Sequence, residues 1–150
     1  MTMFAWTAGL LVVAGLLLVL LVLLILRRRL AVVVVSGLSM EPAFHAGDRL
    51  LVRRTRLARI SVGDVVVFET PDWLGIGEPP PPERRWMVKR VVALPGDPVP
   101  DSVRAVVPER RVAPDRLIVL GDNPSASFDS RQCGLIDAGT LLGVALRRLS

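Results

Sequence analysis

The chain has 150 residues, a hydrophobic fraction of 51% and a formal net charge of +5. Much of the apolar excess lies in the first 26 residues, and the remaining stretch of about 120 residues is long enough for one domain with its own core. No basic helix, zinc-ligand cluster or interleaved aromatic platform accompanies the positive charge, so we expect membrane lipids, and not nucleic acid, as the anionic partner. A single cysteine, Cys133, and a single histidine, His45, exclude an intramolecular disulfide and a structural zinc site, and we predict no metal and no cofactor.

The amino-terminal segment predicts a membrane anchor. No charged side chain occurs from Met1 to Leu26, and the stretch from Gly9 to Leu26 is nearly all Leu, Val, Ile, Ala and Gly. As a helix, that stretch reaches roughly 27 Å, close to the thickness of the hydrocarbon core. A cleaved signal peptide would need a positive amino end, a shorter apolar core and a small-residue cleavage site. We therefore expect a retained transmembrane helix and basic flank in residues 1–29, followed by a domain in residues 30–150.

The remaining sequence alternates β-branched runs with glycine and proline turns, which predicts a mainly β domain. Strands are expected at 30–35, 49–52, 65–68, 86–94 and 117–120, with a strand or short helix at 141–149. Residues 53–59 carry four arginines, which favours a solvated face, and residues 98–115 predict a hairpin or loop without a catalytic role. Residues 69–85 contain four consecutive prolines and predict an exposed loop, in which Trp73, Leu74 and Ile76 would pack against the domain or enter the lipid interface.

A serine and the single lysine are the candidate catalytic residues. Ser39 lies in the turn Ser-Gly-Leu-Ser-Met-Glu-Pro, directly after an apolar strand. A serine hydroxyl needs a neighbouring base to act as a nucleophile. Lys89 is the one lysine among 19 cationic residues and lies in the apolar run Met-Val-Lys-Arg-Val-Val. Arginine cannot lose its proton in a protein, whereas the pKa of lysine shifts readily on burial, so Lys89 is either the base or a solvated strand cation.

Four segments resemble, in the same order, the sequence boxes of type I signal peptidases. They read S-G-L-S-M-E-P, G-D-V-V-V-F, K-R-V-V-A-L-P-G-D and G-D-N-P-S-A-S-F-D-S-R, and the resemblance extends from residue 36 to residue 136. It implies a mainly β fold, an antiparallel β-sheet or barrel-like catalytic domain, behind a single amino-terminal transmembrane helix. It also implies a Ser-Lys dyad, with Ser39 as the nucleophile and Lys89 as the general base.

The last box supplies the residues that the resemblance implies around the dyad. Ser127 would hydrogen-bond the lysine amine, and Asp129 and Arg131 would pair to hold the strands around the dyad. Asp122 is a further supporting residue in the same box. Considered without the resemblance, Asp122, Asp129 and Arg131 indicate a turn with a surface ion pair worth about 0 to 1 kcal/mol.

Three further positions are open to more than one interpretation. The backbone amide of Ser39 is the natural first donor to an oxyanion, but the second donor is open, because some signal peptidases have a serine where this chain has Gly37. A backbone amide or Ser36 would then substitute. His45 lies in a loop and is expected to be a surface residue, with the role of base as its alternative. Cys133 is expected to be a small apolar filler, with a reactive thiol as the alternative.

By resemblance, the protein is a membrane-bound serine endopeptidase that removes signal peptides from exported precursors, with small residues, typically Ala-X-Ala, before the cut. The precursors and membrane lipids are the implied partners. The resemblance places the domain on the extracytoplasmic side of the cell membrane, whereas Arg27, Arg28 and Arg29 favour the cytoplasm by the positive-inside rule. A maturation protease for one or a few precursors is the alternative within the family. A catalytically silent membrane-anchored adaptor is the alternative from another class.

Overall fold

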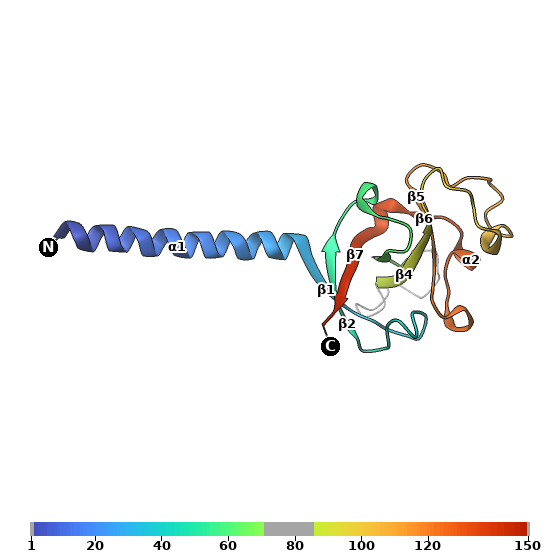
Figure 1. Cartoon of the computed structure of the whole chain (residues 1–150), viewed down its shortest axis with the longest axis horizontal. Helices are drawn as coiled ribbons and strands as arrows, with labels where there is room; N and C mark the ends of the chain where they lie inside the picture. The colour runs from blue at the N-terminus through green and yellow to red at the C-terminus, as the bar shows by residue number, and fades with distance from the viewer. Residues whose placement is uncertain (1, 71–85, 150) are drawn as a thin grey trace.

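The computed structural model describes residues 2–70 and 86–149, with side chains described from residue 13 onward. Helix α1 (Thr2–Arg29) projects from the domain as a single long rod (Figure 1). Its large apolar side chains from Leu16 to Leu26 are all exposed. Within the residues that are described in full, no helix has both the length and the apolar character needed to cross a membrane. The predicted transmembrane helix is therefore not confirmed.

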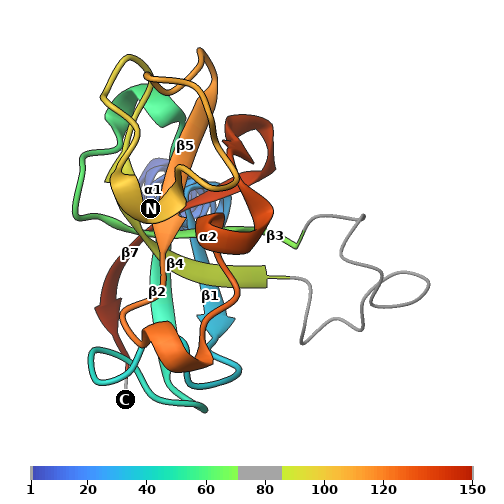
Figure 2. The same cartoon turned by 90° about the vertical axis from the view of Figure 1, so that its right-hand side faces the viewer.

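The domain that follows α1 is a single curled antiparallel sheet with the strand order β1-β2-β7-β3-β4-β5-β6 (Figure 2). The strands are β1 (Leu30–Val34), β2 (Arg49–Arg54), β3 (Val65–Glu69), β4 (Trp86–Ala93), β5 (Arg116–Leu120), β6 (Ile136–Asp137) and β7 (Leu141–Arg148). The prediction of a mainly β, antiparallel domain is confirmed, and the curled sheet forms a half-barrel. Of the two structures expected for residues 141–149, the strand is the one that forms.

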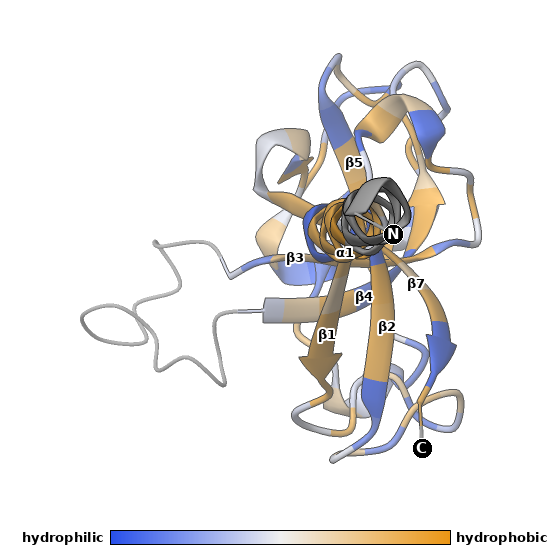
Figure 3. Ribbon diagram, turned by 90° about the vertical axis from the view of Figure 1, so that its left-hand side faces the viewer, coloured by the Kyte–Doolittle hydropathy of each residue, from blue (hydrophilic) through white to orange (hydrophobic). Residues whose placement is uncertain are grey.

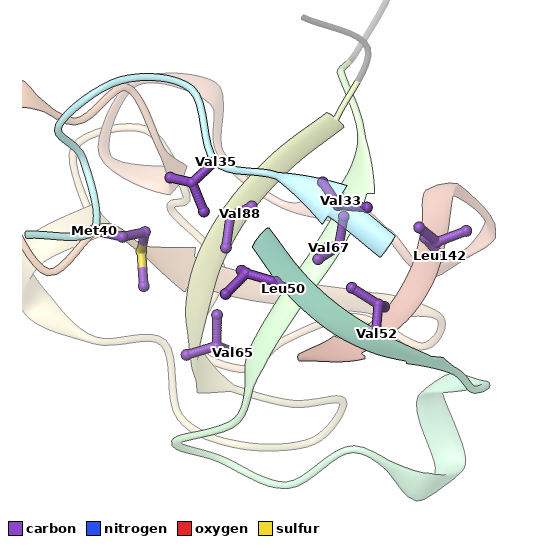
Figure 4. Packing of buried hydrophobic residues seen from close by; sticks show 9 residues of the cluster. All are labelled: Val33, Val35, Met40, Leu50, Val52, Val65, Val67, Val88 and Leu142. Atoms are coloured by element: carbon purple, nitrogen blue, oxygen red, sulfur yellow. The ribbon is translucent and has the colours of Figure 1, made fainter. Parts of the chain in front are cut away.

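Both faces of the central strand are covered, which is why its sequence is continuously apolar. In β3, Val65 and Val67 pack into a first core cluster, whereas Val66 and Phe68 pack into a second on the opposite face. Figure 4 shows the first cluster, in which β1 and β2 fold over β3 and β4. The curled sheet therefore has one hydrophobic cluster on each face of β3.

Residues 98–115 are more ordered than a surface loop. The 3-10 helix η4 (Asp101–Val103) and an isolated bridge between Pro98 and Arg111 shape this segment. Four of its valines bury against β4 and β5 and form a third core cluster: Val99, Val103, Val107 and Val112. Their irregular spacing carries no strand or helix period, so the sequence alone does not reveal this core.

Four short helical elements complete the domain. They are η1 (Leu57–Arg59), η5 (Pro124–Ala126), α2 (Ser130–Cys133) and η6 (Ala138–Thr140), and two of them, η5 and α2, lie in the last box. The arginines expected on a solvated face are divided between elements, because β2 continues through Arg53 and Arg54. Of the predicted proline-rich loop, only Glu69 and Thr70 are described, and Glu69 ends β3; Trp73, Leu74 and Ile76 lie outside the described residues.

Candidate active site

The loop after β1 carries Ser39 and is fixed on both sides by buried side chains. Val35 before it and Met40 after it are 4% and 0% exposed, and both belong to the first core cluster (Figure 4). The chain reverses through Gly37, whose φ of 91° lies in the left-handed region that favours glycine. Ser39 is thereby held half-buried at the end of a rigid turn.

The predicted last box clamps this loop through its main chain. Asn123 donates its backbone amide to the carbonyl oxygen of Ser39 at 3.0 Å and its side-chain amide to the carbonyl of Leu38 at 3.2 Å. The Asn123 side chain is itself oriented by a hydrogen bond from Ser125 Oγ at 2.8 Å. Asn123 is a functional candidate that the sequence analysis missed, although it lies inside the quoted box.

Gly121 makes this close approach possible. A Cβ atom at this position would overlap the hydroxyl of Ser127 and lie 2.6 Å from the carbonyl oxygen of Ser39. Real Cβ atoms do not tolerate such contacts with backbone, so a side chain here would force the serine loop away from β5. The sequence shows only a glycine at the end of an apolar strand. The contact that requires a glycine there is formed in the tertiary structure.

Lys89 reaches the serine from the middle of β4. Its side chain is 4% exposed, and its Nζ donates to Ser39 Oγ at 2.5 Å. In β4, Lys89 pairs with Val66 of β3 in the sheet register, next to the second core cluster. Ser39 and Lys89, the two residues expected to form the dyad, are thus in contact although they lie fifty positions apart in the sequence.

Burial changes the acid-base chemistry of this amine. Removal from water lowers the pKa of Lys89 below its ordinary value of 10.5, because desolvation disfavours the charged ammonium. Asp129 and Cys133 oppose the shift and Arg131 adds to it. The net lowering increases the fraction of neutral amine, which is the form able to accept a proton.

Asp129 is the centre of the polar network beside the dyad. Its carboxylate is fully buried and accepts hydrogen bonds from Arg131, from the Gly121 amide at 2.8 Å and from Ser127 Oγ at 2.6 Å. Burial raises the pKa of Asp129, but these donors outweigh burial and hold the pKa at about 2. Its side chain also caps α2 by accepting from the Arg131 amide. The carboxylate therefore stays charged and ties α2 to the end of β5.

The expected contacts of the last box are partly present. Arg131 forms a two-point pair with Asp129, with Nε at 2.9 Å and the second nitrogen at 2.6 Å. Ser127 instead donates its hydroxyl to Asp129, and the expected hydrogen bond between Ser127 and Lys89 is not among those formed by the described residues. Ser127 therefore contacts the Asp129 carboxylate and not, as expected, the Lys89 amine.

Asp122 faces a different partner from the one suggested by its neighbours in sequence. Arg90, which follows Lys89 in β4, donates to both carboxylate oxygens of Asp122 at 2.8 and 2.6 Å. It also donates to the carbonyl oxygen of Gly63 at 2.9 Å. This pair ties β4 to the loop that carries Asn123. The sequence analysis did not assign a role to Arg90, and its position directly after the lysine was the only available signal.

The dyad opens into a cleft of about 370 Å³ between the serine loop and the start of β4. Apolar side chains provide much of its wall, and Ser39 and Lys89 both line it. Its lining residues are Ser36, Gly37, Leu38, Ser39, Thr70, Trp86, Met87, Lys89, Ala126 and Phe128.

The backbone amide of Ser39, expected as an oxyanion donor, has no acceptor among the residues that the structure describes. Gly37 and Ser36, the two positions considered for the second donor, both line the cleft. His45 is exposed, its backbone amide donates to the Asp48 carboxylate and its carbonyl oxygen accepts from the Asp48 amide; it does not line the cleft. Cys133 packs against the second core cluster, and burial raises the pKa of its thiol to about 11.

In the described parts of the chain, no group of three or more His, Cys, Asp or Glu side chains lies close enough together to hold a metal ion. The chemistry available at the cleft is that of a hydroxyl, a buried amine and backbone amides.

Comparisons with known proteins place the chain in a family. The family model described as signal peptidase, peptidase S26, matches residues 8–105 and 100–149. Probable signal peptidase I-2 of Synechocystis sp. is 30% identical over 131 residues, covering 73% of this chain and 58% of that protein. Signal peptidase I V of Bacillus subtilis is 27% identical, covering 73% of this chain and 80% of that protein.

A mitochondrial relative shows the same likeness. The ATP-independent inner membrane protease subunit 1a of Arabidopsis thaliana is 31% identical over 122 residues, covering 77% of this chain and 67% of that protein. The chain thus spans somewhat over half to four fifths of the length of these relatives. The chain belongs to the signal peptidase family, peptidase S26, whose members are serine endopeptidases.

Proposed function

We propose that the chain is a membrane-anchored endopeptidase that removes signal peptides from exported precursors with a Ser39–Lys89 dyad. The observation that carries the proposal is the 2.5 Å contact between Nζ of Lys89 and Oγ of Ser39, two residues that line the cleft. A lysine in water is neutral in only about one molecule in 2,500 at pH 7. The lowered pKa of the buried Lys89 makes the neutral base more abundant.

In the proposed reaction, neutral Lys89 accepts the hydroxyl proton of Ser39 while Oγ attacks the carbonyl carbon of the scissile bond. The resulting oxyanion is stabilised by the free backbone amide of Ser39. The C–N bond then breaks, the leaving amine takes the proton from the Lys89 ammonium, and an ester on Ser39 remains. Neutral Lys89 next takes a proton from water as the water oxygen attacks the ester carbon. The ester C–Oγ bond then breaks, the signal peptide leaves as a carboxylic acid, and Ser39 Oγ takes the proton back from the Lys89 ammonium.

Four residues outside the dyad act as positioning residues in this proposal. Asn123 holds the Ser39 carbonyl, Asp122 anchors the Asn123 loop to Arg90, and Asp129 with Arg131 fixes the segment beside Lys89. Ser127 supports Asp129 by its hydrogen bond and acts on the amine through that carboxylate.

The proposed substrate is the carboxyl end of a signal peptide with small residues before the cut. The apolar wall, including Leu38, Trp86 and Phe128, and the limited volume of the cleft favour short side chains. A general signal peptidase and a maturation protease for one or a few precursors share this site, and the range of precursors cleaved distinguishes them.

The anchor is part of the proposal: residues 1–29 would hold the domain of residues 30–150 to the cell membrane, with the domain on the extracytoplasmic side. Support comes from the uncharged, apolar sequence before Arg27 and from the exposed apolar side chains of α1. A strand of five residues spans about 17 Å, so β1 would keep Ser39 close to the membrane surface, where a membrane-held signal peptide lies. Digestion of the domain by protease added to intact spheroplasts tests the orientation, and complete protection until lysis would contradict it.

The decisive experiment measures cleavage of an Ala-X-Ala precursor by the full chain in detergent. Ser39→Ala and Lys89→Arg should each lower turnover by at least about 10³-fold while leaving the thermal midpoint near that of the wild type. Arginine keeps a cationic side chain at this position but cannot lose its proton, so it cannot act as a base. Cleavage by Lys89→Arg at the wild-type rate would contradict the dyad, and the absence of cleavage by the folded wild type on any precursor would favour the silent adaptor.

A further inference from the structure

Five arginines from two distant parts of the sequence gather where α1 meets the sheet. Arg27, Arg28 and Arg29 form the last turn of α1. In the pairing of β1 with β2, Arg53 lies opposite Leu30, the residue that directly follows the helix. Arg54 is next to it in β2, and α1 contacts both strands. Figure 3, which looks along α1, shows the helix standing over the point where β1 and β2 lie side by side.

We call these five side chains the basic collar, and they have no counter-charge among the residues that the structure describes. All five are exposed, and no carboxylate or other acceptor from the described residues pairs with any of them. Elsewhere in the described part of the domain, five arginines pair with aspartates within 3.2 Å. Acidic residues therefore neutralise arginines away from the helix end and leave the collar positive.

Guanidinium groups are well suited to bind phosphate oxygens, because their planar donors match two oxygens at once. Five such groups in one small area, without internal anions, create a strongly positive local potential. The neighbouring helix presents exposed apolar side chains from Leu16 to Leu26 up to the first arginine. The boundary between an apolar rod and a polar domain is the level at which phospholipid headgroups lie.

We infer that the basic collar is a binding surface for the phosphate groups of anionic phospholipids. The inference rests on the proposed anchor, and it adds a second point of membrane contact on the domain itself. The helix alone fixes one point and leaves the domain free to tilt. Arg53 and Arg54, at the end of β2, would bind headgroups beside the helix and set the tilt of the sheet. The cleft would then keep a defined orientation toward membrane-held peptides.

The test compares lipid preference in vesicles that contain the full chain. Spin-labelled phosphatidylglycerol and spin-labelled phosphatidylcholine report how strongly each lipid associates with the reconstituted protein. The wild type should prefer phosphatidylglycerol, and the double variant Arg53→Gln/Arg54→Gln should reduce that preference roughly two- to fivefold. Raising the salt concentration to about 1 M should weaken the preference of the wild type as well, because screening acts on exposed charges.

Arg104→Gln/Arg110→Gln is the matched control. It removes the same charge from the exposed segment at the end of the domain far from α1 (Figure 1) and should leave the preference unchanged. An equal loss in both double variants would show a response to net charge alone and overturn the inference. So would an unchanged preference in Arg53→Gln/Arg54→Gln, or loss of the wild-type preference in a few millimolar inorganic phosphate, which would indicate a soluble anion site.

Cleavage of a precursor in detergent is measured on the same variants. It should be unaffected in Arg53→Gln/Arg54→Gln, because neither arginine lines the cleft. Normal cleavage without any lipid preference would overturn the collar and leave the proposed peptidase intact. Loss of cleavage in Ser39→Ala with the lipid preference retained would support both proposals independently.

Discussion

The backbone amide of Asn123 donates to the carbonyl oxygen of Ser39 at 3.0 Å, which joins the end of β5 to the serine loop across 84 positions of sequence. Two residues earlier, Gly121 donates its amide to Asp129. The same short segment therefore touches the candidate nucleophile on one side and the buried carboxylate on the other. Substitutions in this segment should lower the rate of cleavage more strongly than they lower the stability of the fold.

Gly121→Ala should lower turnover with only partial loss of stability. The new methyl group would overlap Ser127 Oγ and the Ser39 carbonyl, and such overpacking costs about 1 to 3 kcal/mol in the free energy of unfolding. Because the displaced group carries the nucleophile, we expect turnover to fall by at least about tenfold. Steady-state cleavage and urea unfolding measure the two effects. Gly139→Ala, which meets only the Asp137 carboxylate at 3.0 Å, is the control and should stay active; equal behaviour of the two variants would contradict the model of a tight approach.

Arg90→Gln should lower turnover more than substrate affinity. It removes the two-point pair with Asp122 and the bond to the Gly63 carbonyl, so the loop that carries Asn123 loses its tether to β4. A loss of about tenfold in kcat with little change in KM corresponds to about 1.4 kcal/mol of lost positioning. Arg116→Gln breaks a more exposed arginine–aspartate pair at 2.7 Å and should have little effect. If both variants cleave like the wild type, the Arg90 tether has no catalytic role.

Asp129→Asn should change both the stability profile and the rate profile with pH. The pKa of Asp129 is depressed from 3.8 to about 2, so its charge contributes stability that is present above pH 3.8 and is lost as pH falls toward 2. Between pH 4 and pH 2, the free energy of unfolding should fall by about 2 kcal/mol more in the wild type than in the variant. Asp129 also raises the pKa of Lys89, and Arg131 lowers it. The variant should therefore show its acid limb of activity at lower pH; a shift to higher pH would contradict this electrostatic assignment.

The pH dependence of the wild type follows from the neutral form of Lys89. Because the base must be unprotonated, kcat/KM should rise with pH through the folded-state pKa of the amine, and that limb should lie below 10.5. His45 is the rival candidate for the base, although it is exposed and does not line the cleft. Profiles of the wild type and His45→Ala over about pH 5 to 11 distinguish the two. The limb should be unchanged in His45→Ala, and its disappearance together with activity would identify His45 as the base.

The sequence by itself determined the class of the domain and the identity of the candidate dyad. Runs such as Val65 to Phe68 are rich in β-branched residues and follow a glycine and an aspartate that favour a turn, so local preference and burial agree, and the strands form where they were expected. Lys89 stood out because it is the only lysine in an arginine-rich chain. The pairing of Arg131 with Asp129 is also short-range, two positions apart, and needs little more than the local turn.

Only the tertiary structure decided which distant residues meet. Periodicity reports whether a side chain is buried, but it does not report which strand lies beside it; the register and curl of the sheet do that. They bring Lys89 to Ser39, turn Arg90 toward Asp122, direct Ser127 to Asp129, and place Arg53 beside the end of α1. The valines of residues 98–115 form a core for the same reason, because β4 and β5 supply the other half of their contacts.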